Sequence, residues 1–221
     1  MEVKVMKNIL GENDRIAAEN RAMFQEKKVY VLNLMGSPGA GKTSVLEKTM
    51  EYLKDKVHMA VIEGDLFTSK DAERIEKHGV PVIQINTAGG CHLDAPMVQQ
   101  TAKDLDLESL DLLIVENVGN LVCPADFPIG ADDSAVVLSI TEGEDKPMKY
   151  PLIFKESSIV LLNKVDLVPY CNFSLANAEE DIDTLNPGVK IVEVSCTKNQ
   201  GIEDWCGWLL QKVAEKKGAQ A

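Results

Sequence analysis

Short apolar runs recur along the chain, and most of them are followed by polar residues or glycine and then by a segment with helical spacing. The runs lie at residues 29–35, 57–62, 82–86, 112–116, 135–140, 159–163 and 189–194. Continuous apolar runs, as opposed to alternating ones, are typical of strands that are buried on both faces. We therefore predict an α/β fold with a mainly parallel sheet of about seven strands and helices on both faces.

Apolar residues also recur at helical spacing, which predicts helices over residues 44–53, 71–78, 95–105 and 202–216. Residues 3–28 have the same spacing, although Gly11 could interrupt a helix there. Because this segment precedes the first strand, we divide the chain into an N-terminal helical extension, residues 1–28, and a single domain, residues 29–221. We expect the extension to pack on the flank of the domain; the alternative is a docking arm for a partner.

One stretch fits the phosphate-binding pattern G-x-x-x-x-G-K-S/T at every fixed position, with an apolar run before it and a helical segment after it. Strand, loop and helix in this order are the context of a P-loop, which disfavours a chance match and predicts a single P-loop NTPase domain. Its glycines let successive N–H groups point at phosphate oxygens, and the helix start adds its positive dipole end. The predicted nucleotide-binding residues here are Gly36, Ser37, Pro38, Gly39, Ala40, Gly41, Lys42, Thr43 and Ser44.

Four of the polar residues near this loop have predicted chemical roles. Lys42, which we expect on a surface loop, would reach the β- and γ-phosphates, and the Thr43 hydroxyl would ligate Mg²⁺. Asp65 follows the second strand and Glu116 ends the fourth, where either carboxylate could hold Mg²⁺ or orient the attacking water. The predicted catalytic residues are thus Lys42, Asp65 and Glu116, and the predicted magnesium residues are Thr43, Asp65 and Glu116. The alternative for the two carboxylates is a helix cap or a turn.

A second nucleotide motif, N-K-x-D, ends the sixth apolar run about 120 residues after the phosphate loop. The Asp166 carboxylate could accept both N1–H and the exocyclic N2–H of guanine, which adenine does not offer in that arrangement. The stem of Lys164 would cover the ring, and a loop after the seventh strand could contact the guanine oxygen. The predicted base-binding residues are Asn163, Lys164, Asp166, Ser195, Cys196 and Thr197. These predict a GTPase; the alternative is an ATP-using relative, which Asp166 disfavours.

A candidate metal site comprises Cys91 and His92 after the third strand and Cys123 after the fourth. Neighbouring loops could bring two thiolates and an imidazole together, and such ligands suit zinc or nickel, with the geometry choosing between them. Three ligands leave a coordination shell incomplete, which water or a symmetric dimer could complete. The alternative is two buried free cysteines and a surface histidine.

Composition narrows the partners. The net charge of −12, with a pI near 4.7, disfavours nucleic acid and anionic membranes. No apolar stretch approaches the roughly 18 residues of a membrane span, and the N-terminus lacks an apolar signal core. The five cysteines form no C-x-x-C pair, so we expect free thiols or metal ligands in a cytoplasmic protein.

Three segments carry a resemblance to a known family: residues 90–95, 116–127 and 141–143. They resemble the accessory GTPases that insert nickel during hydrogenase maturation (HypB-type), a group within the P-loop GTPase class that includes urease nickel-insertion GTPases. The resemblance runs from about residue 8 to the C-terminus. Unlike members with a nickel-storing start, this chain has no cysteine or histidine before His58.

The resemblance implies a set of properties beyond those of the residues themselves. It implies GTP hydrolysis that is slow without partners, binding of GTP and GDP, and homodimers that depend on nucleotide. It implies a Ni²⁺ or Zn²⁺ site of Cys91, His92 and Cys123 shared at the dimer interface. It also implies two protein partners, a nickel metallochaperone and a hydrogenase large-subunit precursor.

The resulting hypothesis is a GTP-hydrolysing accessory protein that couples GTP binding and hydrolysis to nickel delivery during maturation of nickel–iron hydrogenase. Two alternatives are a urease-type nickel-insertion GTPase and a metal-binding scaffold that the nucleotide only stabilises. A small-molecule kinase that uses the same phosphate loop is a further alternative, which the N-K-x-D motif disfavours.

Overall fold

The computed structural model describes residues 8–65 and 70–218. Its centre is a seven-stranded sheet in the order β3-β2-β4-β1-β5-β6-β7, in which every neighbouring pair is parallel. The strands are β1 (Tyr30–Gly36), β2 (Met59–Asp65), β3 (Val82–Asn86), β4 (Leu112–Glu116), β5 (Asp133–Ser139), β6 (Ile159–Asn163) and β7 (Lys190–Val194). The predicted α/β fold is therefore confirmed, with a fully parallel sheet.

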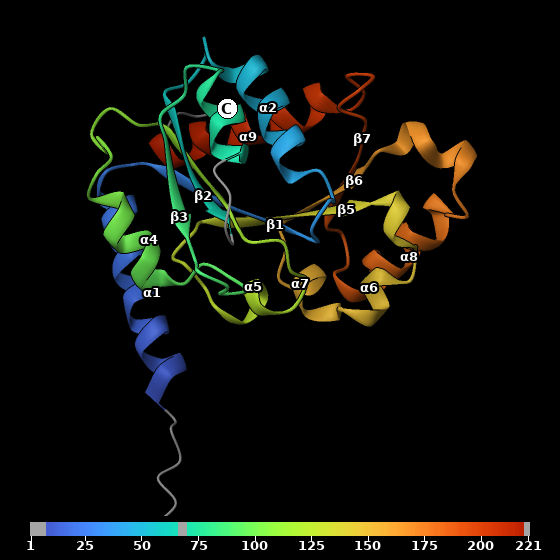
Figure 1. Cartoon of the computed structure of the whole chain (residues 1–221), viewed down its shortest axis with the longest axis horizontal. Helices are drawn as coiled ribbons and strands as arrows, with labels where there is room; N and C mark the ends of the chain where they lie inside the picture. Colours follow the sequence, from blue (N-terminus) through green and yellow to red (C-terminus); the bar gives the residue numbers. More distant parts are fainter. Residues whose placement is uncertain (1–7, 66–69, 219–221) are drawn as a thin grey trace, which may run out of the picture.

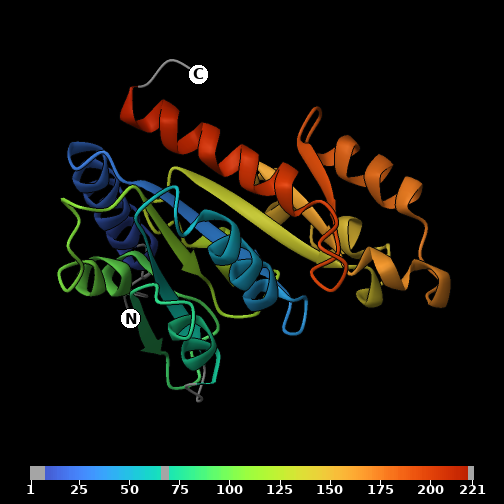
Figure 2. The ribbon, with the colours of Figure 1, turned by 90° about the horizontal axis from the view of Figure 1, so that it is seen from above.

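Helices cover both faces of this sheet. The α-helices are α1 (Asn8–Glu26), α2 (Lys42–Leu53), α3 (Lys70–Glu76), α4 (Ala95–Ala102), α5 (Cys123–Asp126), α6 (Lys146–Lys149), α7 (Pro151–Lys155), α8 (Leu175–Leu185) and α9 (Ile202–Lys217), and the 3₁₀ helices are η1 (Ile140–Glu142) and η2 (Val165–Tyr170). Figure 1 shows α2 and α9 on one face and α1, α4, α7 and α8 on the other, and Figure 2 shows α2 and α9 along one side of the sheet.

The core follows this division into two faces. Beneath α2 and α9, Trp205 is fully buried and its indole N–H donates to the Thr49 hydroxyl at 2.8 Å, which joins the two helices. On the opposite face, one apolar cluster forms around Phe24 of α1 and another around Phe154 of α7. The sheet is thus covered by one continuous cluster on one face and by two separate clusters on the other.

Helix α1 packs on the flank of the sheet, as expected. It runs through Gly11 without a break, while residues 3–7 of the expected helix lie outside the described residues. Its buried Asn20 donates to the carbonyls of Ala95 and Ile129 at 2.9 and 3.0 Å, and Asn13 accepts from the Ala95 N–H at 2.9 Å. These contacts fix α1 against the start of α4.

Two differences from the predicted elements bear on function. Helix α2 begins at Lys42, inside the phosphate motif, and not after it. Helices α5 to α8 were not predicted; α5, α6 and α7 are too short to show helical periodicity, and α8 buries only Ala178 and Ile182. In the described part of the chain, no helix has both the length and the apolar character needed to cross a membrane.

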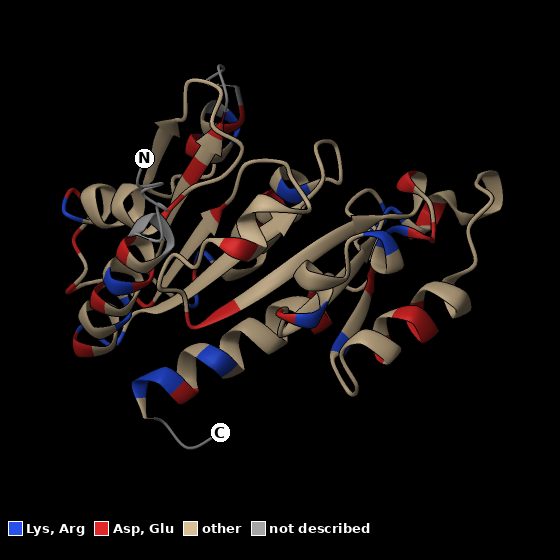
Figure 3. Ribbon diagram, turned by 90° about the horizontal axis from the view of Figure 1, so that it is seen from below, with Lys and Arg blue, Asp and Glu red and all other residues tan. Residues whose placement is uncertain are grey.

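Charged side chains fasten the edge of the sheet where the strands begin. The basic C-terminal end of α9, visible in Figure 3, brings Lys216 to within 2.5 Å of Asp132 and pairs Lys217 with Asp111. Both acidic residues come just before strands. The opposite edge, where the parallel strands end, is therefore the one where loops are free to form a site.

Candidate nucleotide and metal site

The phosphate loop joins β1 to α2, and its glycines are required by space as well as by conformation. Gly41 has φ +98°, and a Cβ there would lie 2.4 Å from the Asn163 amide nitrogen; at Gly36 it would lie 2.4 Å from the Val137 carbonyl oxygen. The loop lines a cavity of about 430 Å³ together with the ends of β2 and β4. The predicted residues in its wall are Pro38, Gly39, Gly41, Lys42, Thr43, Ser44, Asp65, Glu116 and Lys164.

Lys42 is not on a surface loop, and that expectation is wrong. It is the first residue of α2, only 7% exposed, and its Nζ lies 3.4 Å from the carbonyl oxygens of Gly36 and Ser37. Burial lowers the pKa of Lys42, while the nearby Glu116 acts in the opposite direction. The ammonium group is thus held inside the curl of the phosphate loop, where it would meet phosphate oxygens.

The predicted magnesium residues converge on this cavity. The Thr43 hydroxyl donates to Glu116 Oε1 at 2.8 Å, and Asp65 lines the same wall. Burial raises the pKa of Glu116 to about 7. The hydroxyl and the carboxylate are therefore already paired across the start of α2 and the end of β4.

Glu63 is a further carboxylate of this site that the sequence analysis missed. It lies opposite Glu116 in the pairing of β2 with β4, it is 2% exposed, and it lines the cavity. Burial, followed by the charge of Glu116, raises the pKa of Glu63 to about 8. A carboxylate at the end of an apolar run, two residues before Asp65, was the sequence signal for it.

The donor set fits a divalent cation. Among the described residues, Oε2 of Glu63 and Oε2 of Glu116 are buried without a hydrogen-bond partner. Buried carboxylate oxygens without partners are costly, and Mg²⁺ prefers oxygen ligands that include carboxylates and a hydroxyl. Glu116 and the Thr43 hydroxyl would hold such an ion, with Asp65 and Glu63 close to it.

The predicted base-binding loops meet beside the phosphate loop around a cavity of about 220 Å³. Asp166 lines it, and its carboxylate accepts from the hydroxyls of Ser195 at 2.6 Å and Thr197 at 3.0 Å. The Ser195 bond, and then the Thr197 bond, hold the pKa of Asp166 below its usual range. The two hydroxyls therefore orient an ionised acceptor toward the cavity.

The other residues of these loops have supporting positions. Asn163 is buried and donates to the Ala40 carbonyl at 2.8 Å, and Lys164, at φ +65°, donates to the Gly39 carbonyl at 2.6 Å. Both fasten the base-binding loop to the phosphate loop. Burial raises the pKa of Cys196 to about 11, so this residue is a neutral thiol in the wall of the base cavity.

The structure brings Cys91, His92 and Cys123 together, with their candidate ligand atoms all within 4.8 Å of one another. The two Sγ atoms are 3.0 Å apart, and Cys91 Sγ lies 3.5 Å from His92 Nδ1. The loops come from β3 and β4, which are separated by β2. Leu93 packs directly on Gly64 of β2, where a Cβ would be 2.7 Å from Leu93 Cγ, so the loop can lie close over the end of that strand.

The surroundings keep His92 in the form that a metal requires, whereas they favour the protonated form of Cys123. The His92 ring stacks on Phe127 with centroids 4.0 Å apart, and burial lowers the pKa of His92, which keeps the imidazole neutral. The hydrogen bond with Cys91, followed by burial, raises the pKa of Cys123. A thiol must lose its proton to bind a metal, so a cation bound here would displace the protons of both thiols.

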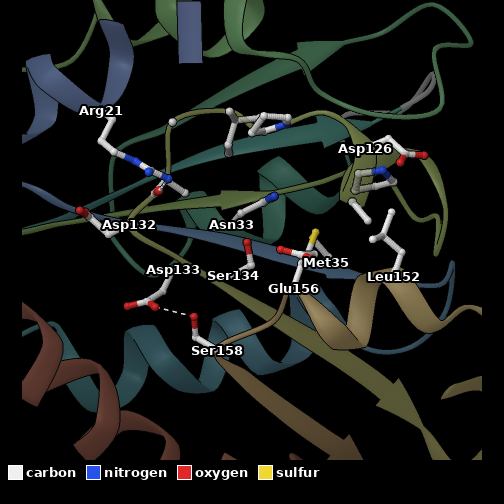
Figure 4. Close-up of a pocket in the computed structure, with 16 residues that line it drawn as sticks. Arg21, Asn33, Met35, Asp126, Asp132, Asp133, Ser134, Leu152, Glu156 and Ser158 are labelled. Atoms are coloured by element: carbon white, nitrogen blue, oxygen red, sulfur yellow. Dashed lines mark hydrogen bonds between the residues drawn. The ribbon is translucent and has the colours of Figure 1, made fainter. Parts of the chain in front are cut away.

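A separate cavity of about 460 Å³ lies between α1 and α7, on the face of the sheet opposite to α2 and α9 (Figure 4). Its floor includes Asn33 and Met35 of β1 and Ser134 of β5, and Arg21 and Leu152 stand in its walls. None of the predicted site residues lines it.

The fold and the phosphate loop define a P-loop nucleotide-binding protein. The model of the family described as "CobW/HypB/UreG, nucleotide-binding domain" matches residues 30–193. The hydrogenase maturation factor HypB of Escherichia coli K12 is 49% identical over 95% of this chain and 71% of its own, and the hydrogenase/urease maturation factor HypB of Helicobacter pylori is 41% identical over 97% and 89%. A crystal structure of Helicobacter pylori HypB in complex with nickel superposes with a TM-score of 0.87, at 41% identity, over 95% of this chain and 98% of that one.

The chain belongs to the CobW/HypB/UreG family and, within it, to the HypB group of hydrogenase maturation factors. The predicted resemblance is therefore confirmed.

The two raised carboxyl pKa values generate a prediction for stability. In the folded protein Glu63 and Glu116 keep their protons up to about pH 8 and 7, whereas in the unfolded chain they lose them near pH 4.5. Between these values the folded state binds more protons, so its free energy of unfolding falls as pH rises. The fall is ~1.4 kcal/mol per pH unit for each group, from both groups between about pH 4.5 and 7 and from Glu63 alone up to about pH 8. Chemical denaturation at several pH values, without nucleotide and with a chelator, measures this slope.

The matched control is Glu63→Gln, which keeps the shape of the side chain but does not titrate. Its stability should fall less between pH 5 and 8 than that of the parent. Equal slopes for the two proteins would contradict the assignment of the raised pKa to Glu63.

Proposed function

We propose that this protein hydrolyses GTP and couples GTP binding and hydrolysis to nickel delivery during maturation of nickel–iron hydrogenase. One observation carries the proposal: the Cys91–His92–Cys123 cluster lies beside the nucleotide cavity, and the segment after Glu116 runs from that cavity to Cys123. The Helicobacter pylori relative whose structure contains nickel supports the choice of metal.

Guanine specificity rests on Asp166. Its carboxylate is held by two hydroxyls at the mouth of a cavity that adjoins the phosphate loop through Gly41 and Ser44. The remaining lone pairs can accept N1–H and N2–H of guanine, and leaving them unpaired against adenine would be costly. GTP and GDP are therefore the proposed nucleotides.

Hydrolysis is assigned to residues around the phosphate cavity. Lys42 would stabilise the charge that develops on the transferred phosphoryl group, and backbone N–H groups of the loop would hold the other phosphates. Mg²⁺ bound by Thr43, Asp65 and Glu116 would supply further neutralisation of phosphate charge. The cationic side chains in the cavity wall are Lys42, Lys164 and Arg74, and Arg74 is already paired with Glu47. We propose that turnover is slow in the absence of partners.

Three metal ligands from one chain leave the coordination shell of the ion incomplete, and a second copy of the chain could complete it. Four large apolar side chains are exposed among the residues that the structure describes, and one of them, Val122, directly precedes Cys123. The others are Met148, Leu152 and Tyr170. Helix α7, which carries Leu152, contacts both α5, which follows Val122, and α6, which carries Met148 (Figure 1). A nucleotide-dependent homodimer through this face would bring two metal clusters toward one axis and bury the apolar side chains.

The remaining assignments follow from this function. The proposed protein partners are a nickel metallochaperone and a hydrogenase large-subunit precursor, and the proposed location is the cytoplasm. We place the boundary between the N-terminal helical extension, residues 1–28, and the nucleotide-binding domain, residues 29–221, at the start of β1. Zn²⁺ could occupy the same ligands, because two thiolates and an imidazole also suit that ion.

A urease-type nickel-insertion GTPase is the second candidate function, and the name of the Helicobacter pylori relative, a hydrogenase/urease maturation factor, is the observation that favours it. Activation of an apo-hydrogenase precursor and of apo-urease in parallel assays with GTP and nickel separates the two. A metal-binding scaffold would activate either target without nucleotide turnover.

Lys42→Ala should lower GTP turnover by at least about a hundredfold, because it removes a charge that stabilises the transferred phosphoryl group. Phosphate release measures turnover, and circular dichroism checks that the variant is folded. Lys48→Ala is the control, since Lys48 lies on the same helix, pairs with Glu51 and does not line the phosphate cavity. Near-parental phosphate release by Lys42→Ala would contradict the assignment and favour the scaffold.

Asp166→Asn should weaken GTP binding by more than tenfold, equivalent to about 1.4 kcal/mol, because an amide donor would face the guanine N–H groups. Titration calorimetry with GTP measures the loss. Xanthosine triphosphate is the matched ligand, since its C2 carbonyl can accept from the new amide; the variant should prefer it to GTP. GTP affinity equal to that of the parent would refute the role of Asp166.

Cys123→Ala should lower nickel affinity by at least about tenfold, because one of three ligands is lost. Nickel and zinc affinities are measured for the apo, GDP-bound and GTP-analogue-bound protein, with Cys171→Ala, a cysteine outside the cluster, as the control. Linkage requires nucleotide and metal to alter each other's affinity by the same factor. Undiminished binding by Cys123→Ala would remove Cys123 from the site, and equal affinities in the three nucleotide states would refute coupling.

A further inference from the structure

Two buried asparagines, Asn33 and Asn117, connect the end of β4 to the loop that carries His92. Asn117 Nδ2 donates to Asn33 Oδ1 at 3.1 Å, and Asn117 Oδ1 accepts from the backbone N–H of Leu93 at 2.9 Å and of Val118 at 3.0 Å. We call Asn33 and Asn117 the amide pair. Neither residue has a role that was predicted from the sequence.

The amide pair is buried in the middle of the sheet. Asn117 is 1% exposed and Asn33 is 3% exposed, and Asn33 interrupts the otherwise apolar strand β1. A buried amide contributes little to stability compared with an apolar side chain of the same shape unless its polar atoms are satisfied. Asn117 makes three hydrogen bonds with its side chain, so its side chain holds other groups in place.

The residues on either side of the amide pair belong to the two sites. Asn117 directly follows Glu116, which accepts the hydrogen bond from Thr43 in the nucleotide cavity. Leu93 directly follows His92 of the metal cluster. Two peptide bonds and one side-chain hydrogen bond therefore connect a candidate magnesium residue, Glu116, to a candidate nickel ligand, His92.

The segment that begins with Asn117 is also confined on its exposed side. A Cβ at Gly119 would lie 2.8 Å from the backbone of Pro38 in the phosphate loop, and the N–H of Asn120 donates to the Gly36 carbonyl at 3.0 Å. Asn120 Nδ2 in turn donates to the Cys91 carbonyl at 3.3 Å. Residues 117–120 therefore touch the phosphate loop on one side and the Cys91 loop on the other.

We propose that Asn117 is the positioning residue that transmits the state of the nucleotide site to His92, an inference that rests on the proposed function. A change in the Thr43–Glu116 hydrogen bond moves Glu116. Because Asn117 is the next residue in the chain, the peptide of Asn117 moves with it. Asn117 Oδ1 carries the Leu93 N–H with it, and this shifts His92 relative to Cys123. Asn33 holds the amide of Asn117 in the orientation that keeps Oδ1 toward Leu93.

The test is the ratio of nickel affinities with a non-hydrolysable GTP analogue and with GDP, measured for the parent and for Asn117→Ala. The parent ratio should differ from one by at least about fivefold, in the usual range of allosteric coupling. In Asn117→Ala it should lie within twofold of one, while nickel binding in the absence of nucleotide is retained. Asn33→Ala, which removes only the acceptor for Asn117 Nδ2, should lower the ratio at least twofold and serves as the second variant if Asn117→Ala does not fold.

Asn186→Ala is the matched control, because the Asn186 amide donates to the Phe154 and Ser157 carbonyls, and none of these three residues lines the nucleotide cavity or belongs to the metal cluster. This control should lose stability and keep the parental ratio of nickel affinities. Asn117→Ala would behave in the same way if the role of Asn117 were merely structural. A parental ratio in Asn117→Ala, or in Asn33→Ala if that is the folded variant, overturns the proposal while the coupling itself stands. A parent ratio of one refutes the coupling of the proposed function and this proposal with it, but leaves GTP turnover and nickel binding untouched.

Discussion

The hydrogen bond between Thr43 and Glu116 joins the start of α2 to the end of β4, and both candidate sites are built on these two elements. Thr43 ends the phosphate motif, and the segment after Glu116 leads to Cys123. Because the bond is buried, the partners of the Glu116 carboxyl group are the Thr43 hydroxyl and any cation that replaces the carboxyl proton. A change of charge in the nucleotide cavity therefore acts directly on the end of β4, where the segment that leads to Cys123 begins.

Local patterns were predictable where the chemistry is contained in a few consecutive residues. The phosphate loop from Gly36 to Thr43 and the N-K-x-D motif lie at strand ends as expected. They were predictable because consecutive residues determine both the geometry of the turn and the burial of the strand before it. The importance of Glu63 and Asn33 was not predictable, because it arises from partners on other strands. Glu63 faces Glu116 only through the register of β2 with β4, and no feature of the segment around Asn33 specifies Asn117 as its partner.

The metal cluster also depends on contacts between strands that the sequence does not specify. Its three residues were predicted as a group on the assumption that their loops are neighbours, yet β2 lies between the two strands concerned. The cluster forms because Gly64 has no side chain, so that Leu93 can lie directly on β2 and bring His92 toward Cys123. The burial of Lys42 was missed for a comparable reason: α2 begins earlier than the apolar pattern indicates, which places the lysine under the loop and not on it.

The close approach of Cys91 and Cys123 has a consequence for the redox chemistry of the protein. With their Sγ atoms 3.0 Å apart, the two thiols need little movement to reach the ~2.05 Å of a disulfide bond. An oxidant such as a peroxide, which accepts two electrons as the S–S bond forms and two protons leave, would remove both sulfur ligands in one event. Thiolates already bonded to a cation are less available to such a reagent. If the proposed metal site is correct, we therefore expect the metal-free protein to be more sensitive to oxidants than the metal-bound protein, and a reductant to keep both thiols available as ligands.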